Sequence, residues 1–184
     1  MSNYTRVQIP GATYFFTLVT FDRQPILTTP QARTVLRQAL RETRLHQPFQ
    51  LDAICLLPDH LHCLWTLPDH DTDFSNRWNR IKGLFSKRYR AANVGHRDSS
   101  PSRQRKGETT IWQRRFWEHC IRDDEDFRHH LDYLHFNPVK HGHATNAFDW
   151  PWSSLARYVQ KGWYERTWGA QEPESIKNMS GLGE

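Results

Sequence analysis

The chain has 184 residues, of which 37% are hydrophobic and 13% aromatic, and it carries a formal net charge of +5. This length and composition indicate one globular domain with its own hydrophobic core. The three cysteines are odd in number and lack metal-binding spacing, which argues against a disulfide framework and a thiolate zinc site and favours a reducing, cytoplasmic compartment. The N-terminus does not resemble a signal peptide, and no apolar run is long enough to cross a membrane.

The first half of the chain predicts a strand, a helix and a hairpin, in that order. Residues 13–21 are apolar, β-branched or aromatic, which is typical of a strand. Thr29 is suited to cap a helix that runs to about Leu45, because a proline follows it and apolar residues recur at helical spacing. The apolar run 51–57 predicts a central strand, and a Pro-Asp turn leads from it into another strand over 60–67.

A basic amphipathic helix and a fourth strand complete the predicted sheet. An apolar stripe at helical spacing runs through residues 74–85, the polar run 93–109 predicts a loop, and residues 111–121 can form the fourth strand. The order strand, helix, strand, strand, helix, strand describes an α+β, ferredoxin-like βαββαβ antiparallel sheet with helices on one face. We expect the opposite face to be left free for a ligand.

Positive charge is concentrated in one segment. Residues 77–115 contain twelve Lys and Arg residues against two acidic residues, so this segment carries +10 and the rest of the chain is negative overall. Such an excess favours a polyanionic partner, with nucleic acid first, because each neutralised phosphate releases counterions. A solvated helix face followed by a basic loop would give the same pattern, and the charge alone leaves both interpretations open.

Two histidines lie two residues apart at the start of the second hairpin strand. Successive side chains of a strand point to opposite faces, so His60 and His62 share one face while Leu61 and Cys63 point to the core. Such a pair can hold a divalent metal ion. Taken alone, it is more consistent with two hydrogen-bonded surface imidazoles, because short motifs have many chance matches.

A further helix, which carries a tyrosine and an amide, follows the sheet. The acidic run 123–126 suits the positive end of a helix dipole, and an apolar stripe follows it at i, i+4 and i+7. Tyr133 and Asn137 lie one turn apart at the margin of this stripe, with His130 beside them. Pro138 predicts that the helix kinks or ends there, which frees Asn137 to project. Taken alone, Tyr133 is more consistent with a half-buried packing residue than with a catalytic one.

Four segments, in this order, resemble the REP-associated tyrosine transposases, which are relatives of the single-tyrosine HUH transposases of the IS200/IS605 type. They are Pro-Gly-Ala-Thr-Tyr-Phe-Phe-Thr at 10–17, Leu-Pro-Asp-His-Leu-His at 57–62, Tyr-Leu-His-Phe-Asn-Pro-Val at 133–139 and Trp-Ser-Ser at 152–154. The likeness extends from about residue 6 to 160, and the combination is far more specific than any one motif. Leu57 stands where many relatives have Met, which keeps the packing, and Asn137 in place of Gln favours the REP-associated branch.

The resemblance implies one HUH transposase domain over residues 1–160, including a C-terminal helix that bears the catalytic tyrosine, and a partly irregular tail over 161–184. It implies a monomeric bacterial enzyme that cleaves and transfers single-stranded DNA at REP-type palindromic hairpins and needs no ATP. The part of the tail over residues 163–184 carries Glu165, Glu172 and Glu174 against an otherwise basic protein, and we expect it to cover the DNA site and restrain activity.

The resemblance also assigns the site. Tyr133 would attack phosphorus and leave a 3′-hydroxyl and a 5′-phosphotyrosine link. His60, His62 and Asn137 would hold Mg²⁺ or Mn²⁺, which suit a mixed nitrogen and oxygen set with open positions. A tyrosine titrates near ~10, so its proton needs a helper, for which His130 is a candidate.

Basic residues of the second helix and the segment after it are the candidate DNA contacts, because cations grip phosphates while aromatic rings stack on bases. Each of them is equally consistent with a solvated surface charge. The candidates are Lys82, Lys87, Arg88, Arg103, Arg105, Lys106, Arg114 and Arg115.

Two other classes fit part of the pattern. A ferredoxin-like sheet with basic and aromatic residues is also the plan of RNA-recognition modules, which would make the protein a non-catalytic binder of single-stranded nucleic acid, although their sheet-borne motif is missing. Replication-initiation and relaxase nucleases of the wider HUH group are the other class. They usually place three histidines around the metal and carry further elements, for which 184 residues leave no room.

Overall fold

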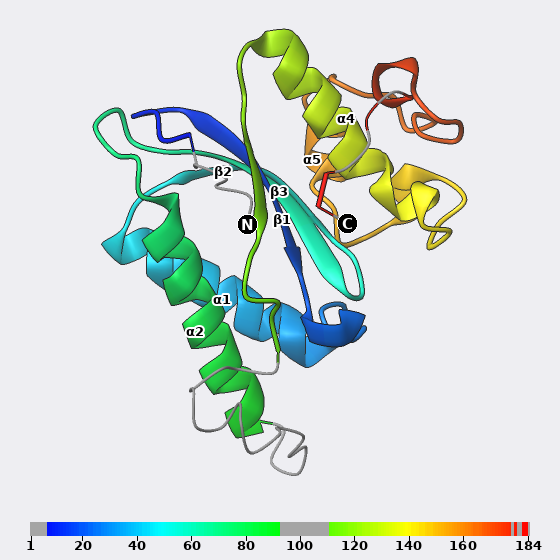
Figure 1. Ribbon diagram of the computed structural model, residues 1–184. Coiled ribbons are helices and arrows are strands. Elements are labelled where there is room, and N and C mark those ends of the chain that lie inside the picture. Colours follow the sequence, from blue (N-terminus) through cyan, green and yellow to red (C-terminus); the bar gives the residue numbers. More distant parts are fainter. Residues whose placement is uncertain (1–6, 93–110, 178, 180–181, 184) are drawn as a thin grey trace.

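The computed structural model describes residues 7–92, 111–177, 179 and 182–183, and the sheet in them is four-stranded and antiparallel (Figure 1). The strands follow the order β2-β3-β1-β4, which confirms the predicted ferredoxin-like α+β fold. No helix within these residues has the length and apolar character needed to cross a membrane. The strands are β1 (Thr13–Val19), β2 (Gln50–Leu56), β3 (His60–Thr66) and β4 (Trp117–Cys120). The helices are α1 (Pro30–His46), α2 (Phe74–Ala92), α4 (Asp124–Lys140) and α5 (Leu155–Gln160), with short 3-10 turns η1 (Phe21–Arg23), η2 (Ala147–Asp149) and η3 (Glu174–Ile176).

Local signals placed most element boundaries within two residues. Thr29 caps α1 as predicted, because its hydroxyl accepts a hydrogen bond from the Ala32 amide at 3.3 Å. The fourth strand is shorter than predicted, because residue 112 makes only an isolated bridge to Thr20, directly after β1, and regular pairing begins at Trp117. Pro138 was expected to kink or end α4, and the helix does not end there. Pro138 lies inside the helix, whose last turn continues because the His141 amide donates to the Asn137 carbonyl at 3.0 Å.

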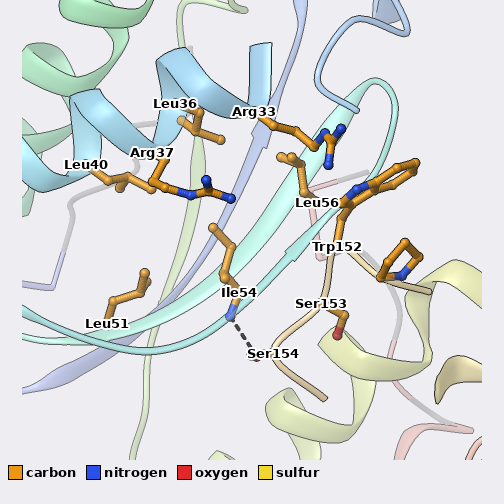
Figure 2. A pocket seen from close by; sticks show the side chains of 11 residues that line it. Arg33, Leu36, Arg37, Leu40, Leu51, Ile54, Leu56, Trp152, Ser153 and Ser154 are labelled. Atoms are coloured by element: carbon orange, nitrogen blue, oxygen red, sulfur yellow. Dashed lines mark hydrogen bonds between the residues drawn. The ribbon is translucent and has the colours of Figure 1, made fainter. Parts of the chain in front are cut away.

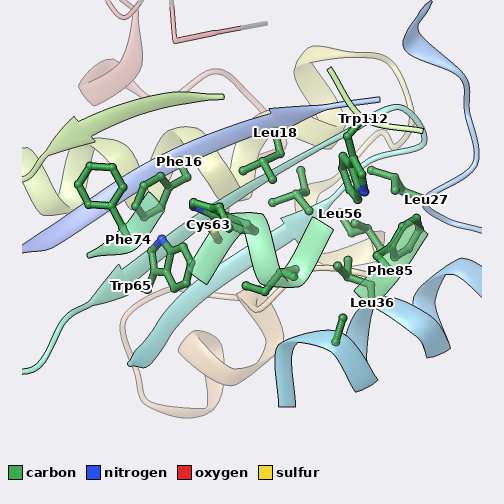
Figure 3. Packing of buried hydrophobic residues seen from close by; sticks show 14 of the residues in the cluster. Phe16, Leu18, Leu27, Leu36, Leu56, Cys63, Trp65, Phe74, Phe85 and Trp112 are labelled. Carbon is green, nitrogen blue, oxygen red and sulfur yellow. The ribbon is translucent and has the colours of Figure 1, made fainter. Parts of the chain in front are cut away.

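One face of the sheet packs on α1 and α2. Side chains of β1 and β3 that point to this face interdigitate with apolar residues of both helices (Figure 3). Trp65 and Trp78 are fully buried there, with ring centroids 4.4 Å apart. Leu61 and Cys63 belong to the same cluster, as the strand alternation predicted.

The opposite face of the sheet is covered, which corrects the expectation of a free face. In Figure 1, α4 lies across the sheet on the side away from α1 and α2. Phe15, Cys55 and Leu64 point to this side and form a second apolar cluster with residues of α4 and the C-terminal segment. Because an apolar sheet face must be buried, the sequence of β2 requires a cover on both sides. The paired histidines therefore lie under α4 and not on an open surface.

The Trp-Ser-Ser segment fastens α4 to the edge strand β2. The Ser154 amide donates to the Ile54 carbonyl at 2.8 Å, and its hydroxyl accepts from the Ile54 amide at 3.0 Å (Figure 2). The same hydroxyl lies 2.9 Å from Nε2 of the buried His135 of α4. Trp152 lines the pocket between α1 and β2, where Arg33 lies 4.9 Å from the centre of its ring. This motif therefore holds the helix that carries Tyr133 against the sheet.

Candidate active site

Strand β3 and helix α4 bring together four side chains that are up to 77 residues apart in the sequence. His60 Nε2 lies 3.2 Å from Asn137 Oδ1, and the rings of His60 and His62 are 5.0 Å apart. The ring of Tyr133 lies 5.5 Å from that of His62. All four side chains are buried, and Tyr133 is 3% exposed. The structure thus assembles the predicted tyrosine, amide and imidazole pair in one place.

Asp59 orients the first imidazole. Its Oδ1 lies 2.7 Å from His60 Nδ1, and its Oδ2 accepts a hydrogen bond from Arg23 at 2.9 Å. Burial raises the pKa of this carboxyl, but the contacts with His60 and Arg23 outweigh burial and hold the pKa well below its usual range. The carboxylate is therefore ionised and accepts the Nδ1 proton, which makes Nε2 the nitrogen that His60 offers to a metal ion.

Thr17 and the C-terminal segment orient the second imidazole. The Thr17 hydroxyl donates to the Leu182 carbonyl at 2.6 Å, and its oxygen lies 2.9 Å from His62 Nδ1. Since the hydroxyl proton is already given to Leu182, this oxygen accepts the proton of His62 Nδ1. Nε2 is then also the nitrogen that His62 could offer to a metal ion. A carbonyl near the end of the chain thus sets the tautomer of a histidine in β3.

The donor set fits a divalent ion. With Nδ1 protonated, the lone pair of His60 Nε2 faces the carbonyl oxygen of Asn137 at 3.2 Å, and two lone pairs at that distance repel unless positive charge lies between them. Two imidazoles and one amide oxygen leave coordination positions open, which suits Mg²⁺ or Mn²⁺ better than structural zinc. A third imidazole, that of His141 at the C-cap of α4, lies 5.1 Å from the ring of His60.

The hydroxyl of Tyr133 has a cationic neighbour that sequence reasoning missed. Lys140 Nζ donates a hydrogen bond to the Tyr133 oxygen at 2.7 Å and lies 4.5 Å from the centre of its ring. The signal in the sequence was the spacing, because residues seven apart lie on one side of a helix after two turns. Asp59 and Thr17 were missed too, although Asp59 stands directly before His60 in the Leu-Pro-Asp-His-Leu-His segment.

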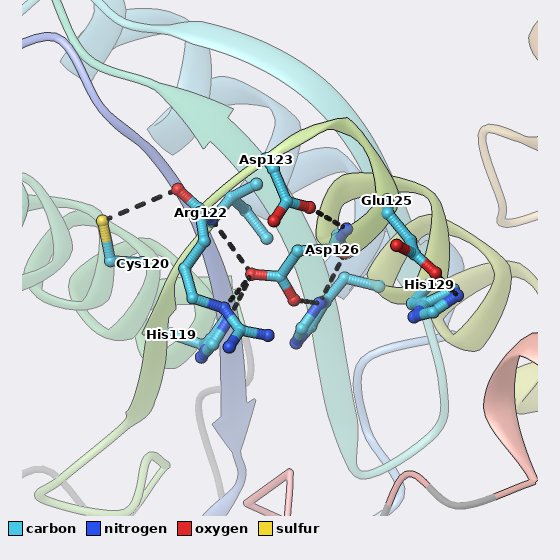
Figure 4. Close-up of polar contacts among 9 residues, drawn as sticks. His119, Cys120, Arg122, Asp123, Glu125, Asp126 and His129 are labelled. Carbon is cyan, nitrogen blue, oxygen red and sulfur yellow. Dashed lines mark hydrogen bonds and ion pairs between the residues drawn. The ribbon is translucent and has the colours of Figure 1, made fainter.

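His130, the predicted helper in proton transfer, contacts Asp126. Figure 4 shows the polar cluster around Asp126 at the start of α4. The Nδ1 of His130 is 2.8 Å from the Asp126 carbonyl and 3.1 Å from Asp126 Oδ1, and its ring stacks on that of His119 at 4.4 Å. Arg122 donates to the same carboxylate at 3.1 Å. These contacts join α4 to β4, whereas Lys140 donates directly to the tyrosine oxygen.

The predicted DNA contacts divide into three groups. Lys82 donates to the Gln113 carbonyl at 2.7 Å and Arg88 pairs with Glu42, so both stabilise the fold. Lys87, Arg114 and Arg115 are exposed, and Arg115 lines a pocket that also contains Thr17 and Gly183. Arg103, Arg105 and Lys106 lie outside the described residues.

Comparison with known proteins gives consistent matches. Residues 8–135 match the family model described as "Transposase IS200 like". A REP-associated tyrosine transposase of Escherichia coli K12 is 42% identical over 91% of both chains. A Haemophilus influenzae relative is 43% identical, with 96% of this chain and 98% of the relative covered. The solved structure of a REP-associated tyrosine transposase bound to a REP hairpin superposes with a TM-score of 0.75 and 38% identity, covering 98% of this chain and all of the other.

Proposed function

The chain belongs to the IS200-like transposases, in the branch of the REP-associated tyrosine transposases, and on this basis we propose that it cleaves and rejoins single-stranded DNA beside REP-type hairpins through a 5′-phosphotyrosine link. The observation that carries the proposal is the convergence of Tyr133 from α4 and of His60 and His62 from β3 on one buried site. A nucleophile beside a metal-binding set is the arrangement that phosphodiester cleavage requires.

Each residue of the site has a role in this reaction. Tyr133 attacks the scissile phosphorus and the 3′-oxygen leaves, so the phosphodiester energy is kept in the link to the protein. A later 3′-hydroxyl can attack that link and release Tyr133. His60, His62 and Asn137 would hold Mg²⁺ or Mn²⁺, which when bound supplies Lewis-acid polarisation of the phosphate. Asp59 and Thr17 keep both imidazoles in the tautomer that such binding needs.

The substrate part of the proposal comes from the relatives and the exposed cations. One solved relative is bound to a REP hairpin, and this chain presents Lys87, Arg114 and Arg115 on its surface. An in-line attack needs a backbone that can bend into the site, which favours single-stranded over duplex DNA.

A covalent adduct tests the proposal directly. Single-stranded DNA with a REP hairpin is incubated with the protein and Mn²⁺, and the adduct is mapped by mass spectrometry. We expect one adduct, on Tyr133, which is lost on chelation and in Tyr133→Phe. A matched control is Tyr158→Phe, because Tyr158 is a buried tyrosine that donates instead to the Asp52 carbonyl of β2. Adduct formation by Tyr133→Phe would refute the assignment.

The non-catalytic alternative is disfavoured by the fold. RNA-recognition modules stack bases on the open face of a four-stranded sheet. Here α1 and α2 cover one face and α4 covers much of the other.

A further inference from the structure

We propose that Lys140 stabilises charge on the Tyr133 oxygen during both DNA cleavage and rejoining, an inference that rests on the proposed role of Tyr133 as the nucleophile. Lys140 Nζ donates to this oxygen at 2.7 Å. The same ammonium lies 4.5 Å from the centre of the Tyr133 ring. Two contacts with one side chain fix the cation beside the atom that would react.

The helix builds this contact. Residues 133, 137 and 140 follow each other at four and three residues, so their side chains share one side of α4. The helix continues through Pro138, and its last residue is Lys140. Had α4 stopped at Asn137, the ammonium would not have been placed two turns after the tyrosine. Because α4 continues past Pro138, Lys140 remains on the same helix as Tyr133 and can reach its oxygen.

The surroundings increase the effect of the charge. Tyr133 is 3% exposed while Lys140 is an exposed residue, so the hydrogen bond is shielded from water on the side of the tyrosine, and such shielding strengthens a charged hydrogen bond. The rings of Phe15 from β1 and His62 from β3 meet the Tyr133 ring nearly edge-on, at interplanar angles of 72° and 73°. They pack against the ring, whereas Lys140 contacts the oxygen.

The reaction gives this cation a role in each direction. In cleavage the phenol proton passes to water, the tyrosine oxygen bonds to phosphorus, the bond from phosphorus to the 3′-oxygen breaks, and that oxygen takes a proton from water. In rejoining a 3′-hydroxyl attacks phosphorus, its proton passes to water, and the tyrosine oxygen leaves. Negative charge lies on the tyrosine oxygen at the start of the first step and at the end of the second. A donor fixed beside that oxygen lowers both barriers.

Single-turnover kinetics distinguish this role from phosphate binding. With saturating hairpin DNA and Mn²⁺, Lys140→Met should slow both adduct formation and its release by an added 3′-hydroxyl strand by about 10- to 100-fold, as expected for the loss of one charged hydrogen bond. DNA affinity, measured in a Tyr133→Phe background to prevent cleavage, should not change. Lys140→Arg should restore most of the rate, since the guanidinium also donates.

Lys161→Met is the matched control. Its ammonium also lies near a tyrosine ring, 5.7 Å from the centre of Tyr158, but Lys161 is the C-cap residue of α5 and Tyr158 is not the proposed nucleophile. Thermal melting verifies that each variant is folded. If Lys140→Met cleaves at the normal rate while Tyr133→Phe forms no adduct, the role of Lys140 is refuted and the proposed function stands. A rate loss matched by an equal loss of DNA affinity also refutes it. An adduct in Tyr133→Phe would instead refute the proposed function.

Discussion

Asp59 acts on the site through the imidazole that it holds. It bridges Arg23 on the surface and His60 in the interior, and it is the residue before the first histidine of the motif. A carboxylate behind a ligand histidine fixes the ring and raises its basicity. The Pro-Asp turn between β2 and β3 thus does more than reverse the chain, because its acidic residue orients the imidazole that is proposed to bind the metal ion.

Asp59→Asn should weaken Mn²⁺ binding by about 10- to 100-fold, the usual cost of losing an outer partner of a ligand histidine. The amide has the shape of the carboxyl group but lacks its charge. Titration calorimetry with Mn²⁺ measures the effect, and Asp124→Asn, an exposed acid in the first turn of α4, serves as the control. Equal affinity in the two variants would contradict the role of Asp59.

At the scale of elements, α4 carries both the proposed nucleophile and the buried titratable groups that hold it against the sheet. Burial lowers the pKa of His135 to about 3, and burial also lowers the pKa of His130. Burial raises the pKa of Asp126, but Arg122 and His119 outweigh burial and hold it below its usual range. The buried imidazoles stay neutral and the carboxylate stays ionised when α4 is docked on the sheet.

Stability should therefore fall in acid, in two stages. Between pH 6.5 and about 3 the unfolded chain protonates His135 and the folded chain does not, so the free energy of unfolding declines by at most about 1.4 kcal/mol per pH unit. The contribution of Asp126 is complete above pH 3.8, the usual value, and is lost as pH falls through its lowered folded value.

Urea denaturation across this pH range checks the first stage. His135→Gln should flatten the dependence of the free energy of unfolding on pH between pH 6.5 and 4, because the variant has no buried imidazole at this position to keep neutral. His129→Gln, a change at a half-exposed position of the same helix, should leave the slope as it is. A slope unchanged by His135→Gln would show that other groups cause the acid sensitivity.

The sequence predicted those elements whose signals are local. Thr29 and the proline after it determined the start of α1, and alternation in β3 assigned His60 and His62 to one face. The cover over that face was missed, although the nearly continuous apolar run of β2 is typical of a strand buried on both sides. Thr17 could not be assigned, because its contact depends on how the C-terminal segment docks. Lys140 was missed for another reason, since the helix was expected to kink or end before it.

At the scale of the whole molecule, the C-terminal segment returns to the site. Leu182 is buried in the cluster under α4, and its carbonyl accepts from Thr17. Gly183 has a φ of 82° and packs so closely that an added Cβ would collide with Trp117. The segment therefore lies against Thr17 and Trp117, on the β1 and β4 side of the site.

A chain that ends at Met179 should form the covalent adduct faster than the full chain. Leu182 and Gly183 would no longer cover Thr17, which lies beside His62, so DNA should reach the site more easily. The fold should persist, since Ile176 stays in its cluster. Single-turnover cleavage rates measure the effect. Saturating Mn²⁺ offsets any loss of metal affinity that follows when His62 loses the restraint of the C-terminal segment. An unchanged or slower rate in a folded truncated chain would contradict a restraining tail.

The uneven distribution of charge over the molecule predicts which cations contribute to DNA affinity. Of the candidate cations, Arg115 is exposed and lines the pocket that reaches Thr17, whereas Lys82 is engaged in the fold. Arg115→Gln should weaken binding of single-stranded DNA uniformly across sequences and reduce the slope of log affinity against log salt by about 0.7, as for one phosphate contact.

Fluorescence anisotropy over a salt series in the Tyr133→Phe background measures this slope without cleavage. Arg166→Gln is the control, because Arg166 lies over the Phe148 ring, 5.3 Å from its centre, and does not line this pocket. If Arg115→Gln changed affinity for one sequence and left the salt slope unchanged, Arg115 would be reading a base. If it changed neither, the DNA strand would not approach the site along β4.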